Sequence, residues 1–389
     1  MNTAVIVDVV RTPVGRGKPG GALSGVHPVD LSAHVLRTVL ERNGLESGQI
    51  DDVIWGCVSQ VGDQSMNVAR QSVLAAGFDE TVPATTIDRQ CGSSQQAAHF
   101  AAQGVIAGAY DIVIAGGVES MSRVPLGSSA HGGAPSEGLR ERYPDGLVNQ
   151  GISAELIAGR WGLSRTDLDT YAAASHRRAA DAWAQGLFDS QVIGVPGVDL
   201  AIDETVRAGT TVAGLSGLNP AFRTDETAAR FPGLDWRITA GNSSPLTDGA
   251  SAVLIMSEQK AAVLGLRPRA RFHAFAVVGD DPIMMLTGPI PATRRVLDRA
   301  GMSIDAIDAY EVNEAFASVP LAWARELHAD PARLNPWGGA IALGHALGSS
   351  GTRLLGTLVA HLEASGARYG LQTMCEGGGM ANATIIERL

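Results

Sequence analysis

Cysteine is scarce in this chain, with three residues, Cys57, Cys91 and Cys375, among 389. An odd number without a C-x-x-C spacing argues against a disulfide framework and against a structural zinc site. We therefore expect a protein of a reducing compartment, the cytoplasm, that holds no metal.

Long apolar runs and basic stripes are also missing. No run approaches the roughly 18 residues that span a bilayer, and the chain begins directly with the strand-like run 3–10. We expect neither a targeting segment nor a membrane partner. A net charge of −10 opposes nonspecific binding to nucleic acid. The binding site for an anionic ligand would therefore need its own basic residues.

Glycine and apolar residues are plentiful, with 47 glycines and 45% hydrophobic residues. A chain of this length can bury a large core and suggests two or three domains. The apolar runs 52–56 and 111–117 alternate with helical stretches, which is typical of an α/β fold with a sheet covered on both faces. The last third repeats this order with a helix at 294–300, a strand at 304–312 and a strand that ends at 377–379.

Glycine pairs and turns recur at similar intervals. Gly116–Gly117 precede Gly377–Gly378 by about 261 residues, and Cys91 precedes His345 by about 254. This pattern indicates a duplicated α/β unit that brings two turns to one surface.

The segment between the halves is polar and loop-rich, with helical pieces at 153–161 and 165–185 and turn clusters at 127–136 and 195–198. An insertion of this length in an α/β domain is typical of a lid or ligand-binding subdomain. The predicted domains are 1–117 with 246–267, the lid at 118–245, and 268–389.

Cys91 lies in a polar turn between the strand-like run 81–87 and an alanine-rich helix at 95–107. A thiol at a helix N-terminus faces unpaired N–H groups and the positive end of the dipole, which favour thiolate and can hold an anion. The other interpretation is a small buried hydrophobic residue.

Three downstream residues favour the nucleophile. His345 stands among five glycines before a predicted helix at 352–362, where its imidazole can accept a thiol proton. Cys375 stands at a strand end before Gly377–Gly379, whose N–H groups suit an oxyanion. Asn313 offers a carboxamide after a strand. Each also has a structural interpretation: a tight helix–sheet turn, a strand cap and a helix N-cap.

Together these segments resemble the thiolase family essentially from end to end. The matching motifs, in the family's order, are 5–15, Arg89–Ser94, Ala115–Ser122, Leu163–Arg165, Gly241–Ser244, Asp248–Ala250, Asn313–Phe316, Gly344–His345 and Cys375–Gly379. The resemblance implies a thiolase fold, with duplicated five-layered αβαβα halves and an inserted lid, and a homodimer or homotetramer.

The resemblance also implies cleavage of a 3-oxoacyl-CoA by CoA to acyl-CoA and acetyl-CoA. Cys91 would attack the 3-keto carbon and carry the acyl group, while His345 accepts its proton. Cys375 would protonate the acetyl-CoA enolate and then deprotonate the incoming CoA. Asn313 would hold a water at the first oxyanion. The N–H groups of Cys91 and Gly377 would stabilise the tetrahedral oxyanion.

Coenzyme A would be a substrate, with no tightly bound cofactor. By the same resemblance, Ser244 would contact its pantetheine and Arg207 its nucleotide end, while Gln150 and Phe316 would line the substrate pocket. A lid arginine exposed to solvent is the other interpretation of Arg207.

Several positions depart from the family's usual residues. Ala346 replaces a proline, Ala381 and Pro245 replace glycines, and Gln150 stands where many short-chain members have methionine. These departures argue against a simple acetoacetyl-CoA preference. The C-terminal segments resemble actinobacterial members that degrade steroid-type or other bulky acyl chains.

Three alternatives stay open. The same residues serve the biosynthetic formation of acetoacetyl-CoA from two acetyl-CoA. A non-catalytic acyl-CoA-binding protein is disfavoured because Cys91, Asn313, His345 and Cys375 are all retained. A 3-oxoacyl synthase that uses carrier-protein thioesters would not need the second thiol.

Overall fold

The computed structural model describes residues 2–130 and 133–389. Within them ten strands form one mixed sheet in the order β4-β3-β5-β6-β1-β7-β10-β9-β8, and β2 pairs with β6. The strands are β1 Ala4–Arg11, β2 Gly15–Arg16, β3 Asp52–Gly56, β4 Ala84–Ile87, β5 Ile112–Ser120, β6 Thr247–Ser257, β7 Ala270–Gly279, β8 Ala309–Val312, β9 Tyr369–Glu376 and β10 Met380–Arg388. The predicted turn cluster at 127–136 includes two residues, 131 and 132, outside the described part.

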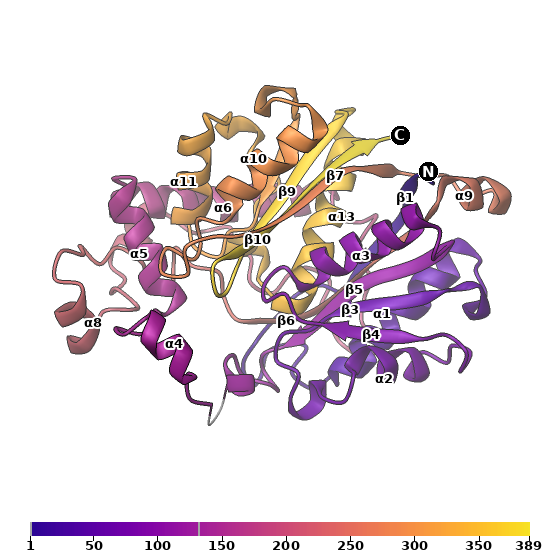
Figure 1. Cartoon of the computed structure of the whole chain (residues 1–389), viewed down its shortest axis with the longest axis horizontal. Coiled ribbons are helices and arrows are strands. Elements are labelled where there is room, and N and C mark those ends of the chain that lie inside the picture. Colours follow the sequence, from indigo (N-terminus) through magenta and orange to yellow (C-terminus); the bar gives the residue numbers. More distant parts are fainter. Residues whose placement is uncertain (1, 131–132) are drawn as a thin grey trace.

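The helices cover both faces of the sheet and build the lid (Figure 1). They are α1 Pro28–Asn43, α2 Val68–Ala75, α3 Ser93–Ala107, α4 Glu137–Arg142, α5 Gln150–Arg160, α6 Arg165–Ala184, α7 Val212–Ser216, α8 Asp225–Arg230, α9 Glu258–Leu264, α10 Pro289–Ala300, α11 Ser318–Leu327, α12 Ala340–Leu343 and α13 Leu347–Ser365.

Strand pairing repeats in the two halves. In the first half β3 runs parallel to β5, and β5, β6 and β1 follow with antiparallel pairing. In the second half β8, β9, β10 and β7 show the same order and directions. The halves join where β1 and β7 pair antiparallel at Val5–Arg271 and Ile6–Ala270. The predicted duplication is confirmed.

The register corrects the predicted correspondence of the glycine pairs. Ser120 pairs with Asp248 where β6 begins, and Glu376, 256 residues after Ser120, pairs with Met380 where β10 begins. If the two halves are aligned with this offset of 256 residues, Gly116–Gly117 of β5 match residues inside β9. They do not match Gly377–Gly378. The prediction was wrong because β5 continues past its glycines, whereas β9 ends before the Gly377–Gly379 turn.

Five layers follow from the packing of this sheet. Helices α1 and α2 cover the outer face of the first half, and α10 and α11 cover the outer face of the second. Helices α3 and α13 pack on each other between the halves. The strand β6 is buried throughout: Leu254 and Met256 face the outer core, and Val253 and Ile255 face α3 and α13. This alternation explains its continuous apolar sequence, since both faces of the sheet are covered.

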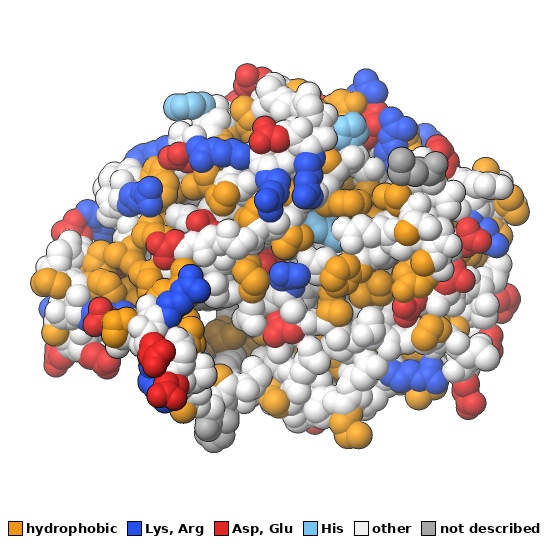
Figure 2. Space-filling model, in the orientation of Figure 1, with side chains coloured by type: hydrophobic (Ala, Val, Ile, Leu, Met, Phe, Trp, Pro, Cys, Tyr) orange, Lys and Arg blue, Asp and Glu red, His pale blue; other side chains and the backbone are white. Residues whose placement is uncertain are grey.

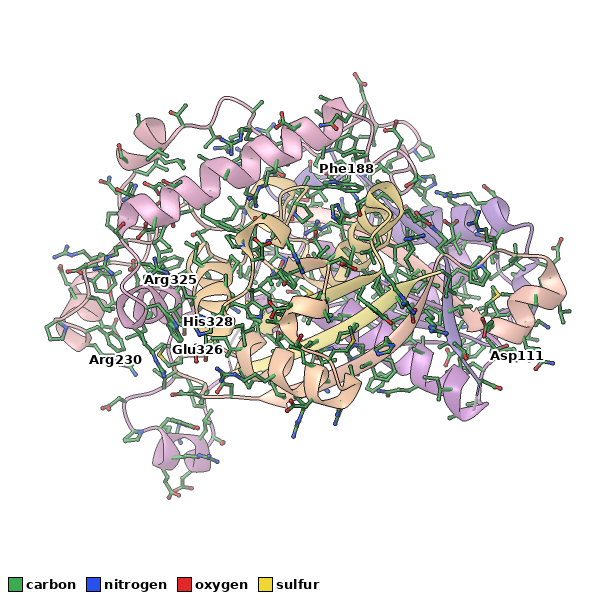
Figure 3. All side chains as sticks on the ribbon, turned by 90° about the horizontal axis from the view of Figure 1, so that it is seen from above. Asp111, Phe188, Arg230, Arg325, Glu326 and His328 are labelled. Atoms are coloured by element: carbon green, nitrogen blue, oxygen red, sulfur yellow. The ribbon has the colours of Figure 1, made fainter. Side chains whose placement is uncertain are left out.

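The lid helices pack on the second half. α5 and α6 bury apolar residues against α11 and the segment after β8. α6 begins at a capping box in which Ser164 and Asp167 bond each other's backbone N–H groups. Arg325 and Glu326 lie on α11 (Figure 3). At the end of α5, they bond the carbonyl and the indole N–H of Trp161, respectively. These contacts fix the lid beside the strand ends where the candidate catalytic residues lie. The three-part domain division itself stays a prediction.

Candidate active site

As predicted, Cys91 lies in the turn between β4 and α3; the helix begins at Ser93, two residues before the predicted start, with Gly92 as its N-cap. The turn is held by Ser93, whose hydroxyl accepts from the N–H of Arg89 at 2.9 Å and donates to the carbonyl of Gln90 at 2.6 Å. Gln90 takes a left-handed conformation, with φ of 50°. The side chain of Cys91 is therefore presented from a rigid turn, and the residue is only 3% exposed.

Burial dominates the chemistry of this thiol. It raises the pKa of Cys91 to about 12, and the carboxyl group of Glu376 contributes in the same direction. The backbone N–H at the turn and the side chain of Gln150 oppose this effect without overcoming it. The expected thiolate is thus not the resting form, because desolvation outweighs the helix N-terminus. A base has to take the proton.

His345 supplies an unprotonated nitrogen. The hydroxyl of Ser350 donates to the carbonyl of Ala346 at 2.8 Å, so it accepts from Nδ1 of His345 at 2.7 Å. Nε2 is then the acceptor, and it lies 3.3 Å from the amide nitrogen of Asn313. Burial, and then the charge of Arg353, lower the pKa of His345 to about 3. The imidazole is therefore neutral and basic at Nε2.

The loop that carries His345 lies between α12 and α13. The latter starts at Leu347, five residues before the predicted start, because Gly348 and Gly351 allow close packing on β3 and α3. Ala346, where the family usually has proline, has φ of −71°. Proline would impose nearly the same angle, so the backbone at Ala346 keeps the conformation that the family's proline requires.

Cys375 is the penultimate residue of β9 and is fully buried. Burial raises its pKa well above the usual value, and the charge of Cys91 adds to the rise, so the two sulfur groups interact. Asn313 follows β8, and its N–H donates to the carbonyl of Thr373 on β9 at 3.0 Å. Its Oδ1 is buried and has no hydrogen-bond partner within the described chain. Cys91 and Cys375 thus form one interacting pair, and Asn313 and His345 form a second. Leu347, two residues after His345, packs in one cluster with Cys91 and Met374, which places the two pairs in the same region.

The turn after β9 faces two glutamine side chains. A β-carbon on Gly377 would lie 2.9 Å from Oε1 of Gln90 and 3.4 Å from Nε2 of Gln150. Gln150 is the first residue of α5 and also bonds toward Cys91. The structure therefore brings Gln150 to the nucleophile.

The remaining predicted residues lie further out. Ser244 is half-buried, and its N–H donates to the carbonyl of Ala315 at 3.0 Å, which ties the lid to the segment after Asn313. Phe316 packs edge-on against Phe222 with ring centroids 5.8 Å apart. Arg207 is exposed on the lid, and no described contact joins it to the four residues above.

Glu314 is a structural residue that the sequence analysis did not identify. It is buried beside Asn313 and accepts four hydrogen bonds of 2.7–3.1 Å, from the hydroxyls of Tyr171 and Ser175, the amide of Asn335 and the N–H of Ile341. One carboxylate thus ties the lid helix α6 to α12, just before the histidine. Its position in the Asn313–Phe316 motif is the sequence feature that could have identified Glu314.

Glu119 has a similar place in the first half. Its carboxylate accepts from the N–H of Gly348 at 2.9 Å and from three donors on the loop after β3, which are the N–H groups of Val58 and Ser59 and the side chain of Gln64. It therefore anchors the start of α13 to the first half.

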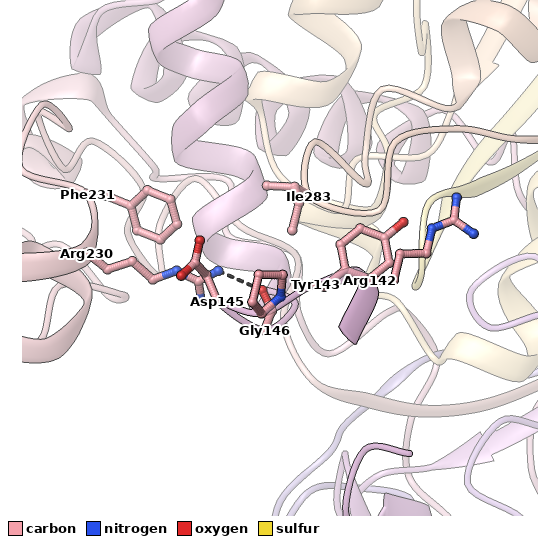
Figure 4. Close-up of a pocket in the computed structure, with 8 residues that line it drawn as sticks. Arg142, Tyr143, Asp145, Gly146, Arg230, Phe231 and Ile283 are labelled. Carbon is pink, nitrogen blue, oxygen red and sulfur yellow. Dashed lines mark hydrogen bonds between the residues drawn. The ribbon is translucent and has the colours of Figure 1, made fainter. Parts of the chain in front are cut away.

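A groove of about 450 Å³ runs beside the lid. It is lined by Arg142, Tyr143, Pro144, Asp145, Gly146, Arg230, Phe231 and Ile283. In Figure 4, Ile283 lies between the rings of Phe231 and Tyr143, and Figure 2 shows the surface hollowed between α4 and the body of the molecule. The carbonyl of Ile283 accepts from Ser153 of α5 at 2.7 Å. The groove thus borders the helix that begins at Gln150.

Across the described residues, no group of three His, Cys, Asp or Glu side chains is placed to hold a metal ion. No helix in that part of the chain is long and apolar enough to cross a membrane.

The model of the thiolase N-terminal domain matches residues 4–259 and that of the thiolase C-terminal domain matches residues 266–388. The chain therefore belongs to the thiolase family and is an acyltransferase. It is 47% identical to the steroid 3-ketoacyl-CoA thiolase FadA6 of Mycobacterium tuberculosis, over all of this chain and 95% of that one. It is 45% identical to a 3-ketoacyl-CoA thiolase of Vibrio cholerae, over all of both chains. The crystal structure of the Bacillus anthracis acetyl-CoA acetyltransferase matches with a TM-score of 0.89 and 37% identity, over 100% of this chain and 99% of that one. The resemblance and the fold predicted from the motifs are confirmed.

Proposed function

We propose that this chain cleaves a 3-oxoacyl-CoA with CoA to acyl-CoA and acetyl-CoA through an acyl group on Cys91. The observation that carries this proposal is the bonding of His345, which leaves Nε2 as an acceptor beside Asn313 at a site that also holds two interacting thiols. The names of the similar proteins, 3-ketoacyl-CoA thiolases, support the same reaction.

The first half-reaction needs a base, because the resting Cys91 is a thiol. Nε2 of His345 takes the proton, and the sulfur attacks the 3-keto carbon. The carbon–carbon bond breaks, the acyl group stays on Cys91, and the acetyl-CoA enolate takes the proton of Cys375. The N–H groups of Cys91 and Gly377 face the oxyanion, and each such donor contributes about 10²–10³-fold to kcat.

In the second half-reaction CoA enters as a substrate. Cys375, now a thiolate, takes the proton of the CoA thiol, and the CoA sulfur attacks the acyl group on Cys91. Cys91 leaves as a thiolate and recovers its proton from His345. Asn313 holds a water through its amide. Ser244 and Arg207 bind the pantetheine and nucleotide parts of CoA, with Arg207 providing positive charge on an acidic protein.

We further propose a bulky acyl chain as the substrate in fatty-acid or steroid degradation. Gln150 and Phe316 would line the pocket, and the groove of about 450 Å³ beside α5 provides room beyond them. The name of the similar mycobacterial protein, a steroid 3-ketoacyl-CoA thiolase, favours this class. Biosynthetic formation of acetoacetyl-CoA is the second candidate, favoured by the likeness to an acetyl-CoA acetyltransferase.

The quaternary structure we propose is a homodimer or a dimer of dimers. β4 is the end strand of the sheet, and Met66, Leu74 and Phe100 are exposed apolar residues of the first half. We also propose a cytoplasmic location, which the three free cysteines of the described chain support.

The test compares thiolysis of acetoacetyl-CoA with that of longer and ring-bearing 3-oxoacyl-CoAs. Cys91→Ala is expected to lose at least about 10³-fold in kcat and to form no acyl-enzyme by mass spectrometry. Cys57→Ala is the matched control, because Cys57 is a buried thiol to which the mechanism assigns no role. Full activity without Cys91 would contradict the mechanism. Preference for acetoacetyl-CoA would favour the second candidate.

A further inference from the structure

Glu376 is a buried acid that the mechanism above does not use. It is the last residue of β9, directly after Cys375, and is fully buried. Neither of its carboxyl oxygens has a hydrogen-bond partner among the residues that the structure describes. An ionised carboxylate in such a place is costly. The carboxyl group of Glu376 is therefore favoured in its uncharged, protonated form.

The carboxyl group of Glu376 packs against the nucleophile turn. A β-carbon on Gly92 would overlap its Oε1 and lie 3.2 Å from its Cγ, so the contact requires glycine at this position. Gly92 follows Cys91 and is the N-cap of α3, a helix of 15 residues. Cys91 and Glu376 thus share one helix N-terminus, whose N–H groups and dipole stabilise negative charge.

The charged groups that act on Glu376 come from the same turn. Burial raises the pKa of Glu376 well above its usual range, the charge of Arg89 opposes this rise, and the charge of Asp88 adds to it. The two neighbouring thiols respond in turn, because an ionised Glu376 raises the pKa of both Cys91 and Cys375. Two negative charges at one buried helix end are unfavourable, so the titrations are coupled.

We propose that Glu376 is a positioning residue that controls the nucleophile: while uncharged it leaves the N-terminus of α3 to the Cys91 thiolate, and when ionised it holds Cys91 as a thiol. The proton of Glu376 leaves to solvent, and the proton of Cys91 still goes to His345. The inference rests on the proposed function only in taking Cys91 as the nucleophile.

The test measures alkylation of Cys91 by iodoacetamide from pH 6 to pH 10, with peptide mass spectrometry, in the parent protein and in Glu376→Gln. Glutamine is close in shape to a protonated glutamate and cannot ionise. We expect equal rates at the acidic end and rates roughly tenfold higher in Glu376→Gln at the alkaline end, since an added neighbouring charge shifts a pKa by about one unit. Superimposable profiles, or a uniform loss of rate in Glu376→Gln, would overturn the proposal.

Glu387→Gln is the matched control, because this glutamate of β10 pairs with Arg271 and Arg368 instead of the nucleophile turn. Its profile is expected to follow that of the parent protein. Infrared difference spectroscopy of the parent protein against Glu376→Gln provides a second measurement. A protonated-carboxyl band at neutral pH that is lost in the variant supports the proposal, and a band that is unchanged, for which Glu311 with its pKa of about 8 would account, contradicts it. Alkylation of Cys91 does not require thiolysis of a CoA ester. The role of Glu376 can therefore be tested even if the thiolysis assay shows no activity.

Discussion

At the scale of single residues, burial shifts the pKa values of the proposed nucleophile, Cys91, and of the proposed base, His345, in opposite directions. Burial raises the pKa of Cys91 to about 12, while burial also lowers the pKa of His345 to about 3. Both shifts favour the uncharged thiol and imidazole over the ion pair. The thiolate of Cys91 and the protonated imidazole of His345 are then needed only when substrate is bound. The N-terminus of α3 and the oxyanion donors stabilise the negative charge during the reaction.

Buried neutral histidines predict a pH dependence of stability. The pKa of His99 and of His345 is lowered from 6.5 to about 3. Since the folded value is below the unfolded one, the unfolded chain binds more protons between these pH values. The stabilisation is complete above about pH 6.5 and falls with decreasing pH, by up to about 1.4 kcal/mol per pH unit for each histidine.

The check is urea denaturation of the parent protein and His99→Gln at pH 7 and pH 5.5. Glu311, whose pKa burial raises to about 8, acts in the opposite direction, so the two proteins are compared at each pH. His99→Gln should lose less stability on acidification than its parent. His328→Asn, at an exposed helix end, is the control; equal slopes in all three proteins would contradict the expectation.

At the scale of elements, two buried carboxylates hold the site together. Glu314 joins α6 to α12 on one side of the histidine loop, and Glu119 joins the loop after β3 to α13 on the other. Each accepts four hydrogen bonds, so the loop that carries His345 is fixed on both sides by a fully bonded carboxylate.

Loss of the lid carboxylate predicts a loosened lid. Glu314→Gln replaces an acceptor of two hydrogen bonds by an NH₂ group that faces donors, and it should lower the free energy of unfolding by about 3 kcal/mol. Hydrogen exchange should increase in α6 more than in α3. Glu258→Gln, at an exposed glutamate of α9 outside the lid, is the control, with little change expected. Unchanged exchange in α6 would contradict the assigned role.

The type of each of these elements, helix or strand, was predictable from the sequence, but its first and last residues were less so. The run 304–312 was predicted as one strand, but Ile304–Ala306 form a 3-10 turn and β8 is only Ala309–Val312. Ile304 and Ile307 are three residues apart, which is a turn spacing as much as a strand spacing. The predicted strand at 81–87 likewise begins only at Ala84. Burial on both faces removes the alternation that would mark a strand's ends.

At the scale of the whole molecule, the duplicated sheet has an end strand at β4. Met66 is 87% exposed on the loop before α2, and Asn67 of the same loop donates to the carbonyl of Ala84 in β4. A second copy could cover this edge by pairing β4 with β4. The proposed dimer would then bury apolar residues that otherwise meet water.

Light scattering coupled to size exclusion checks this assembly. Met66→Asp should raise the dimer dissociation constant by at least about tenfold, equivalent to about 1.4 kcal/mol. Val263→Asp is the control, since Val263 is 74% exposed on α9 in another part of the surface. A monomeric parent protein, or equal effects of the two substitutions, would contradict the proposed interface.

The amino-acid sequence by itself determined the family and the duplication, and it predicted the site residues Cys91, Asn313, His345 and Cys375, because turns that carry chemistry are short and use glycine and polar residues in fixed order. The tertiary structure decided what those residues are in the resting state. Burial, a property of the packed halves, makes Cys91 a thiol and His345 neutral. The contact of Glu376 with Gly92 joins positions that are far apart along the chain, so only folding brings this acid to the nucleophile.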